Sequence, residues 1–391
     1  MIIVLVIIGL SLVILVHEAG HFIVAKLSGI TVLEFGIGFP PRLFGALRRR
    51  EREVDEVVPA TKWLFFFGKP GVEEAERAER EGATIYSVNW LPFGGFVRMQ
   101  GEDGSPEAGE DAAMPVKTSA AKSVPFANVS FWKKAATLAA GVSMNVIFGW
   151  LILFAVFLIG TPQHLMIAEV LPDSPAAAAG LTSEDVILSA RLDATTLADP
   201  VSSDALIALV RSSGEKPIRF EVKRGDAVRT VEIAGKTNAE TGAIQIGVSL
   251  SDAGLAPLPF HSALWKSIQA TGETLVAVVA GFWYLVTRVF TTPEVLKSVA
   301  GPVGIVNMAV QSGSLGLIYI LQFLALISLN LAVLNLIPFP ALDGGRILLT
   351  VIEKVFGRPL PRRFQTAVNA IGFVALILLM VVVTVQDIGK L

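Results

Sequence analysis

Residues 1–25, MIIVLVIIGLSLVILVHEAGHFIVA, place the motif HEAGH (residues 17–21) inside an otherwise apolar segment. An ionisable side chain at the depth of a bilayer is costly unless it is paired or bound to a metal, so it marks a functional site by default. Positions i and i+4 of a helix share one face, so His17 and His21 can hold one zinc ion while Glu18 points at its bound water. The alternative, a satisfied polar patch in a helix bundle, accounts less well for the place of this motif.

The composition indicates a membrane protein with a soluble part. Of 391 residues, 53% are hydrophobic and 17% are charged, and the mean hydropathy is +0.63. This is too apolar for an ordinary soluble protein and too charged for a chain that lies wholly in lipid. The net charge of −2 gives no support for nucleic-acid binding. The absence of cysteine excludes disulfides and cysteine-ligated zinc, so histidine and carboxylate are the good zinc ligands that remain.

Four segments are long and apolar enough to span a bilayer of about 30 Å. The first has no basic start and contains HEAGH itself, so we expect a retained helix and not a cleaved signal peptide. Basic residues cluster at 42–52, 133–134 and 346–363 and should be cytoplasmic, which puts the N-terminus and residues 161–250 outside. The four segments are Ile2–Ala25, Ala135–Gly160, Leu315–Ile337 and Ala367–Val385.

A fifth apolar segment, Ala263–Phe290, is interrupted by charged residues (Lys266, Glu273 and Arg288). If it crossed the membrane once, the basic loop at 346–363 would lie outside, against the positive-inside rule. Two crossings do not fit, because each needs about 20 residues. We therefore predict a helix on the outer interface, followed by a turn at Gly301–Gly304 that leads to the third span.

Two further regions have their own patterns. Thr31–Phe39 and Thr84–Met99 are β-rich and punctuated by glycine, which predicts a sheet folded back towards the zinc site from the cytoplasmic side. Between them, residues 73–81 predict a short solvated helix within a charged insertion at 69–83, and residues 101–127 predict a flexible loop. Residues 164–250 combine short β runs with two brief helical patterns, which is typical of a small, partly open β-barrel with two helices.

A catalytic zinc site usually has three protein ligands and a water, so one ligand is missing from HEAGH. His164 and His261 lie on the outer side and are interpreted as surface residues. Asp343 follows the third span, near its cytoplasmic end. His17 lies about 24 Å into the first helix, which enters from outside, so the two residues lie at a similar depth. Pro338 and Pro340 prevent a continued helix and leave a loop that can turn Asp343 inward. The alternative is an aspartate that only caps a helix before Gly344.

Together, HEAGH, the stretch from Asn335 to Gly344 (NLIPFPALDG), PFGGFVRM at 92–99 and GPVGI at 301–305 resemble the site-2 protease family of intramembrane zinc metalloproteases. The likeness is strongest to the bacterial regulator of sigma-E protease type, which cleaves anti-sigma factors. The resemblance implies zinc on His17, His21 and Asp343, Glu18 as general base, and Asn335 near the substrate. It also implies that residues 164–250 form a single PDZ domain.

The predicted fold is a polytopic α-helical membrane protein with four transmembrane helices, a membrane re-entrant β-sheet and one extracytoplasmic PDZ-like α+β domain. The expected segments are the first helix with HEAGH (1–30), the re-entrant region and cytoplasmic loop (31–128), the second helix (129–160), the PDZ-like domain (161–252), the interfacial helix and connector (253–314), the third helix with its motif (315–342), a cytoplasmic loop (343–365), and the fourth helix and tail (366–391).

The predicted activity is zinc-dependent hydrolysis of a peptide bond within or near the membrane segment of a single-pass protein, in a bacterial inner membrane. Anti-sigma-factor-like proteins and signal-peptide remnants are the expected substrates. An extended substrate strand could be held by the sheet near Gly94 and Gly95. The alternatives are a non-catalytic PDZ-containing scaffold or chaperone, which would not need Glu18, and a zinc transporter, for which this motif and one aspartate do not form a path.

Overall fold

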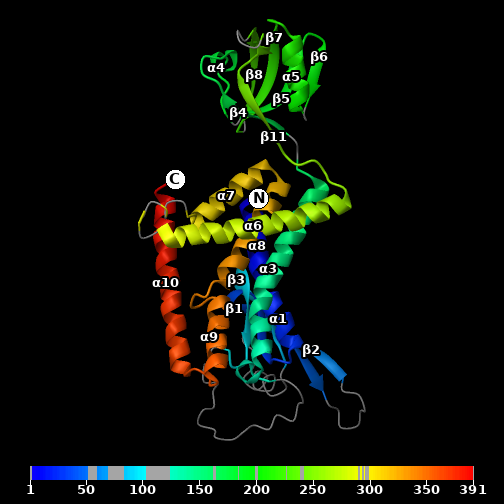
Figure 1. Cartoon of the computed structure of the whole chain (residues 1–391). Coiled ribbons are helices and arrows are strands. Elements are labelled where there is room, and N and C mark those ends of the chain that lie inside the picture. Colours follow the sequence, from blue (N-terminus) through cyan, green and yellow to red (C-terminus); the bar gives the residue numbers. More distant parts are fainter. Residues whose placement is uncertain are drawn as a thin grey trace. The chain divides into compact units, whose positions relative to one another are not determined.

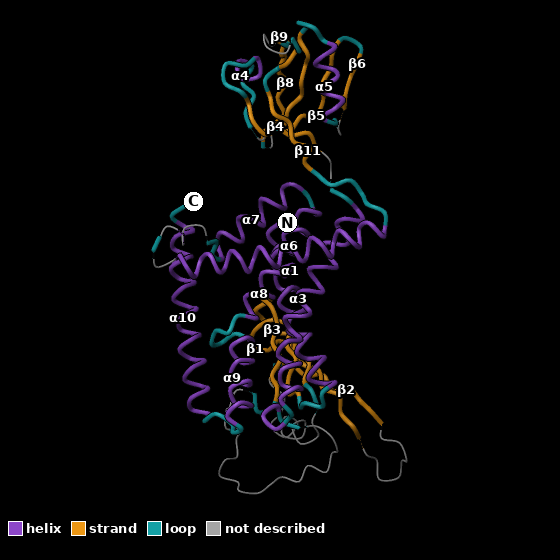
Figure 2. Tube along the Cα trace, viewed as in Figure 1, coloured by secondary structure: helices purple, strands orange, loops and turns teal. Residues whose placement is uncertain are grey.

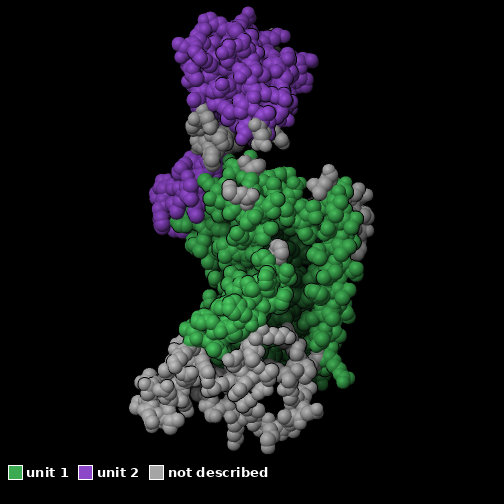
Figure 3. Space-filling model, turned by 180° about the vertical axis from the view of Figure 1, so that it is seen from behind, with its two compact units in different colours: residues 1–154, 265–391 green, residues 155–264 purple. Residues whose placement is uncertain are grey.

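The computed structural model describes most of the chain. It forms two compact units, one made of residues 1–154 with 265–391 and the other of residues 155–264 (Figure 3). Each unit has its own buried hydrophobic clusters, so each is described by itself. The described residues are 2–51, 60–68, 83–102, 124–161, 164–183, 185–198, 201–225, 227–237, 242–288, 291–292, 295 and 299–390.

Within the described residues, five helices are long and apolar enough to cross a bilayer. Four of them correspond to the predicted spans, with bounds that differ by a few residues. The fifth, α6, was predicted as an interfacial helix; it also has the length of a span, and its most apolar stretch is the least apolar of the five. The helices are α1 (Ile2–Leu27), α3 (Phe131–Ile159), α6 (Phe260–Arg288), α8 (Leu317–Leu336) and α10 (Arg362–Ile388).

Helix α1 lies in the middle of the first unit because glycines let its neighbours approach closely (Figure 1). A side chain at Gly20 would collide with the backbone oxygen of Ala140 in α3. One at Gly9 would collide with Leu324 in α8. Small residues at helix crossings are a common means of close packing in membranes. The crossing with α3 sits within the HEAGH motif and therefore brings α3 against the candidate site.

The predicted sheet is present beside α1, and its strands are long and bent (Figure 2). Phe35 in the first strand pairs with Tyr86, near the start of the third strand, and with Val97, near its end. The third strand therefore bends back, and both of its halves pair with the first strand in one sheet. The Phe22 ring of α1 packs on Phe35, with 4.9 Å between ring centroids. The strands, in spatial order β2–β1–β3 and all antiparallel, are β1 (Val32–Glu51), β2 (Ala60–Phe67) and β3 (Ile85–Met99).

Some of the segments predicted between the first two long helices lie outside the residues that the structure describes. The predicted helix at 73–81 lies there entirely, and so does the charged insertion apart from Ala83. Of the predicted loop at 101–127, residues 103–123 lie outside. The remainder includes a bridge between Ile30 and Val124 and the 3-10 helix η1 (Phe126–Asn128).

Two connecting segments are helical where the sequence analysis predicted none. The prediction of a turn at Gly301–Gly304 is wrong, because helix α7 (Pro302–Leu315) begins there. Proline suits the first position of a helix, where its missing N–H has no intrahelical role, and Gly301 is the N-cap. The predicted loop at 343–365 contains α9 (Asp343–Phe356), which ends at Gly357 with a φ of 66°.

The second unit is an α+β fold with two brief helices, as predicted, and with short strands, of which the β run predicted at its end is divided into β10 and β11. Six strands form one sheet in the order β11–β4–β5–β7–β8, with β6 on β5. Ser174 and Ser202 cap the two helices by accepting backbone N–H groups. The elements are β4 (His164–Val170), α4 (Pro175–Ala178), β5 (Val186–Leu192), β6 (Thr195–Ala198), α5 (Ser203–Ser212), β7 (Pro217–Arg224), β8 (Ala227–Ala234), the short pair β9 (Lys236–Thr237) and β10 (Ile244–Gln245), and β11 (Val248–Ala253).

Candidate metal centre

The two histidines of HEAGH lie on one face of α1 and are buried. His17 is 5% exposed and His21 is 6% exposed. Their Nε2 atoms are 3.1 Å apart, and the rings meet edge to face. One turn of helix separates the two residues, so both rings point the same way, as the i,i+4 spacing predicts.

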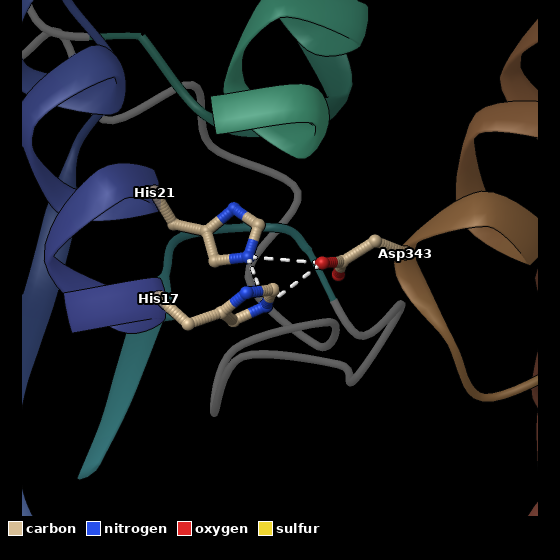
Figure 4. Close-up of side chains that lie close together, drawn as sticks. All are labelled: His17, His21 and Asp343. Carbon is tan, nitrogen blue, oxygen red and sulfur yellow. Dashed lines mark hydrogen bonds and ion pairs between the residues drawn. The ribbon is translucent and has the colours of Figure 1, made fainter. Parts of the chain in front are cut away.

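Asp343, the first residue of α9, completes a three-residue cluster (Figure 4). Its Oδ2 atom is 3.0 Å from His17 Nε2 and 3.2 Å from His21 Nε2. Asp343 belongs to the first turn of α9, so it does lie at a helix start, but its carboxylate faces the imidazoles. A carboxylate there also benefits from the positive end of the helix dipole.

The turn that delivers Asp343 depends on small residues. Helix α8 ends at Leu336, and Asp343 begins the next helix. A side chain at Gly344 would collide with the backbone oxygens of Leu336 and Ile337, and one at Gly345 with that of Phe339. The two glycines after Asp343 are therefore needed for a tight reversal.

Helix α3 lies behind both imidazoles, which the sequence analysis did not predict. The backbone oxygen of Thr137 is 2.8 Å from His21 Nδ1. The side-chain amide of Asn145 is 3.3 Å from His17 Nδ1. Between them, Gly141 leaves room for the rings, because a Cβ there would lie 2.7 Å from His17 Cε1. The sequence carries only a partial signal: these three residues are four apart, but Ser143 is a further polar residue of the same helix.

The other predicted site residues lie close to this cluster. Glu18 is half-buried on α1. A Cβ on Gly95 would be 3.9 Å from Glu18 Cγ and 3.1 Å from Leu15. Gly94 lies against Ile14 in the same way. The Asn335 side-chain nitrogen in α8 is 3.4 Å from His17 Nε2.

The remaining histidines do not join the cluster within the described residues. His261 is exposed in α6. His164 begins β4 in the other unit.

An ion pair lies next to the cluster. Arg346, one turn after Asp343 in α9, pairs with Glu102, which follows β3. This contact joins the end of β3 to the helix that carries Asp343.

The three donors fit a zinc ion. At zinc–nitrogen distances of about 2.0–2.1 Å, tetrahedral ligand atoms lie about 3.3 Å apart. The two Nε2 atoms and the Asp343 oxygen are 3.0–3.2 Å apart. That oxygen is buried and has no hydrogen-bond partner of good geometry in the described part of the chain. Two imidazoles and a carboxylate are a common ligand set of catalytic zinc.

Comparisons with known proteins match nearly the whole chain. The model of peptidase family M50 matches residues 5–55 and 73–379. A predicted zinc metalloprotease of Clostridium perfringens is 33% identical over 389 residues, covering 99% of this chain and 98% of its own. The zinc metalloprotease RasP of Shouchella clausii is 29% identical over 426 residues, with 97% of each chain covered.

Two further matches are a named bacterial protease and a solved domain structure. The regulator of sigma-W protease RasP of Bacillus subtilis is 28% identical over 411 residues, covering 96% of this chain and 95% of its own. Among solved structures, the PDZ domain of an SdrC-like protein from Listeria monocytogenes aligns with 22% of this chain and 85% of its own, at 24% identity and a TM-score of 0.19.

Proposed function

The chain belongs to peptidase family M50 and is a zinc metalloprotease, and from this premise we propose that His17, His21 and Asp343 hold the zinc while Glu18 is the general base. The observation that carries this proposal is the convergence of two imidazole nitrogens and one carboxylate oxygen within 3.2 Å of one another. Three protein ligands with a fourth position for water or substrate are usual for catalytic zinc.

The chemistry is hydrolysis of a peptide bond. Bound zinc supplies a Lewis acid that polarises the carbonyl and makes water more acidic. Glu18 adjoins His17 in sequence and is absent from the three-residue donor cluster, which supports a role in proton transfer and not as a ligand. Its carboxylate takes a proton from the attacking water and delivers it to the leaving nitrogen.

The substrate class is a single-pass membrane protein cut within or near its membrane segment. HEAGH lies in a helix long and apolar enough to span a bilayer, which supports a cut at membrane depth. The B. subtilis relative is named a regulator of sigma-W protease, which favours regulated intramembrane proteolysis of anti-sigma-factor-like substrates. Signal-peptide remnants are a second substrate class with the same chemistry.

The substrate must be extended at the scissile bond, and the sheet supports a way to hold it. Strand β3 is at one edge of the sheet. An extended segment adds to that edge near Gly94 and Gly95 through backbone hydrogen bonds. Gly95 faces Leu15 and Glu18, so the added strand runs past the catalytic residues. Asn335, beside His17, contributes its amide to the substrate backbone.

The membrane arrangement follows the charge rule. Helices α1, α3, α8 and α10 span a bacterial inner membrane, α6 lies on the outer interface, and the N-terminus and residues 161–252 lie outside. Residues 161–252 are a PDZ-like domain that excludes substrates with bulky ectodomains. Deletion of residues 164–250 should then allow cleavage of substrates whose ectodomains are intact, and unchanged selectivity would count against such a gate.

The deciding experiment compares wild type with Glu18→Gln in membranes that contain a reporter with one cleavable helix. Loss of the general base should lower cleavage by roughly 10²–10⁴-fold. Zinc content should be unchanged, because glutamine keeps the shape of the side chain and Glu18 is not a ligand. Cleavage at the wild-type rate by Glu18→Gln would refute the assigned base. Zinc binding without any cleavage by wild type would favour the scaffold alternative.

A further inference from the structure

The second nitrogen of each imidazole determines how the two rings are held. Both Nε2 atoms face the Asp343 oxygen, so a metal bound there leaves a proton on each Nδ1. Both rings are buried, and a buried N–H group needs an acceptor. For His21 the acceptor is the backbone oxygen of Thr137, at 2.8 Å. A backbone oxygen is fixed by the helix, so this ring is held whatever side chain stands at Thr137.

His17 has a different neighbour at its Nδ1. The group there is the Asn145 side-chain amide, whose nitrogen Nδ2 is 3.3 Å from His17 Nδ1. Asn145 is fully buried, and its Oδ1 atom has no hydrogen-bond partner within the described ranges. The oxygen and nitrogen of an amide exchange places by a half-turn of the group. With the oxygen towards His17, the orphaned acceptor meets the N–H that needs one.

We infer that Asn145 is a positioning residue whose amide oxygen accepts a hydrogen bond from His17 Nδ1 and so aims Nε2 at the metal. This inference rests on the proposed ligand role of His17. Partners of this kind fix the tautomer and orientation of a metal-bound histidine, and their loss typically weakens metal affinity about 10–100-fold.

The backbone at Asn145 lies at a contact between α3 and α8. Ser328 of α8 donates a hydrogen bond to the backbone oxygen of Asn145, at 2.8 Å, so two helices meet at this residue. One turn earlier on α3, Gly141 lets the helix lie directly against both imidazoles. The face of α3 formed by Thr137, Gly141 and Asn145 therefore holds one ring through its backbone and the other through a side chain.

This asymmetry gives a test that needs no substrate. The zinc affinity of the purified full-length chain is measured by competition with a chromophoric chelator. Asn145→Leu keeps the approximate volume and removes the acceptor, so affinity should fall about 10–100-fold. Asn145→Asp keeps an acceptor oxygen and should bind zinc at least as tightly as wild type.

Two matched variants remove hydroxyls from the same buried region but leave both acceptors in place. Thr137→Val keeps the backbone oxygen that faces His21, and Ser328→Ala keeps the Asn145 amide. Both should retain wild-type zinc affinity. The thermal unfolding of each zinc-free variant reports on packing separately from metal binding.

Several outcomes would overturn the role of Asn145. One is equal zinc affinity in Asn145→Leu and wild type. Another is an equal loss in Asn145→Leu and Asn145→Asp, since only one of them lacks an acceptor. If Asn145→Leu does not fold, Asn145→Ala carries the same expectation. Zinc binding that survives His17→Ala would instead refute the proposed ligand set, which separates the two failures.

Discussion

Asp185 in the second unit and Asp343 in the first carry carboxylates that are satisfied in opposite ways. Asp185, in the second unit, is fully buried and receives two N–H groups from Arg224, each at 2.7 Å, and the N–H of Thr182 at 3.0 Å. Asp343, in the first unit, faces two imidazole nitrogens, and its Oδ2 lacks a good donor in the described residues. A carboxylate with its own cation is a structural element, whereas one among the proposed metal ligands needs a cation from outside.

The largest expected effect follows from removing the charge of Asp343. Asp343→Asn keeps the shape of the side chain and loses the charge of the proposed third ligand. Zinc affinity should therefore fall by more than the roughly 10–100-fold typical of outer partners, and cleavage should be lost. Chelator competition and a membrane reporter measure the two. Full zinc occupancy and activity in Asp343→Asn or Asp343→Ala would show that another group is the third ligand.

The same variant sharpens the comparison when zinc is absent. Without a cation, the buried Oδ2 atom of Asp343 has no good donor in the described residues, so Asp343→Asn should leave the stability of the zinc-free first unit unchanged or raise it. Hydrogen exchange of α1 and α9 in the zinc-free chain measures this. Faster exchange in the variant would mean that Asp343 is held by contacts within the protein.

A smaller effect of opposite sign is expected at Asp185. Asp185→Asn weakens a charged, two-bond contact with Arg224 and should destabilise the second unit by about 2 kcal/mol. The surface pair of Arg219 and Glu232 is the matched control, because both side chains are more than half exposed. Glu232→Gln should cost less than about 1 kcal/mol. Urea unfolding followed by exchange in β5 and β7 compares the two, and equal costs would contradict the difference.

The smallest effect is in the pH dependence of the second unit. The hydrogen bond from Arg224 holds the pKa of Asp185 below its ordinary value. Its contribution to stability is therefore fully present above the unfolded-state pKa, near 4, and is lost as pH falls through the lower folded-state pKa. Unfolding of wild type and Asp185→Asn between neutral pH and pH 2 should show a steeper acid loss in wild type. Parallel curves would mean that Asp185 does not carry this dependence.

Much of the candidate site could be predicted because its signals are local. The i,i+4 spacing places His17 and His21 on one face, and the prolines before Asp343 end α8. The role of Asn145 could not be predicted in the same way. Ser143 and Asn145 are both polar residues of one apolar helix, and only the packing of α3 on α1 distinguishes the one that faces His17.

The connecting helices were missed for a different physical reason. Glycine and proline at 301–304 have the composition of a turn, but Pro302 is equally suited to the first position of a helix. Which of the two forms depends on the apolar residues that follow, and in α7 these pack against α1. Tertiary packing decides between a turn and a helix start, and residues 301–304 alone do not show that packing.

The distance along the chain between the two parts of the metal centre has a consequence for biosynthesis. The histidines are at residues 17 and 21, whereas Asp343 comes after α8 in the chain. At about 5–20 residues per second, a ribosome needs on the order of 15–65 s to pass from one to the other. During that interval the nascent chain carries two histidines without their carboxylate partner. With the proposed ligand set, the protease stays inactive while it is inserted among other newly made membrane helices, and a product truncated before residue 343 should never become active.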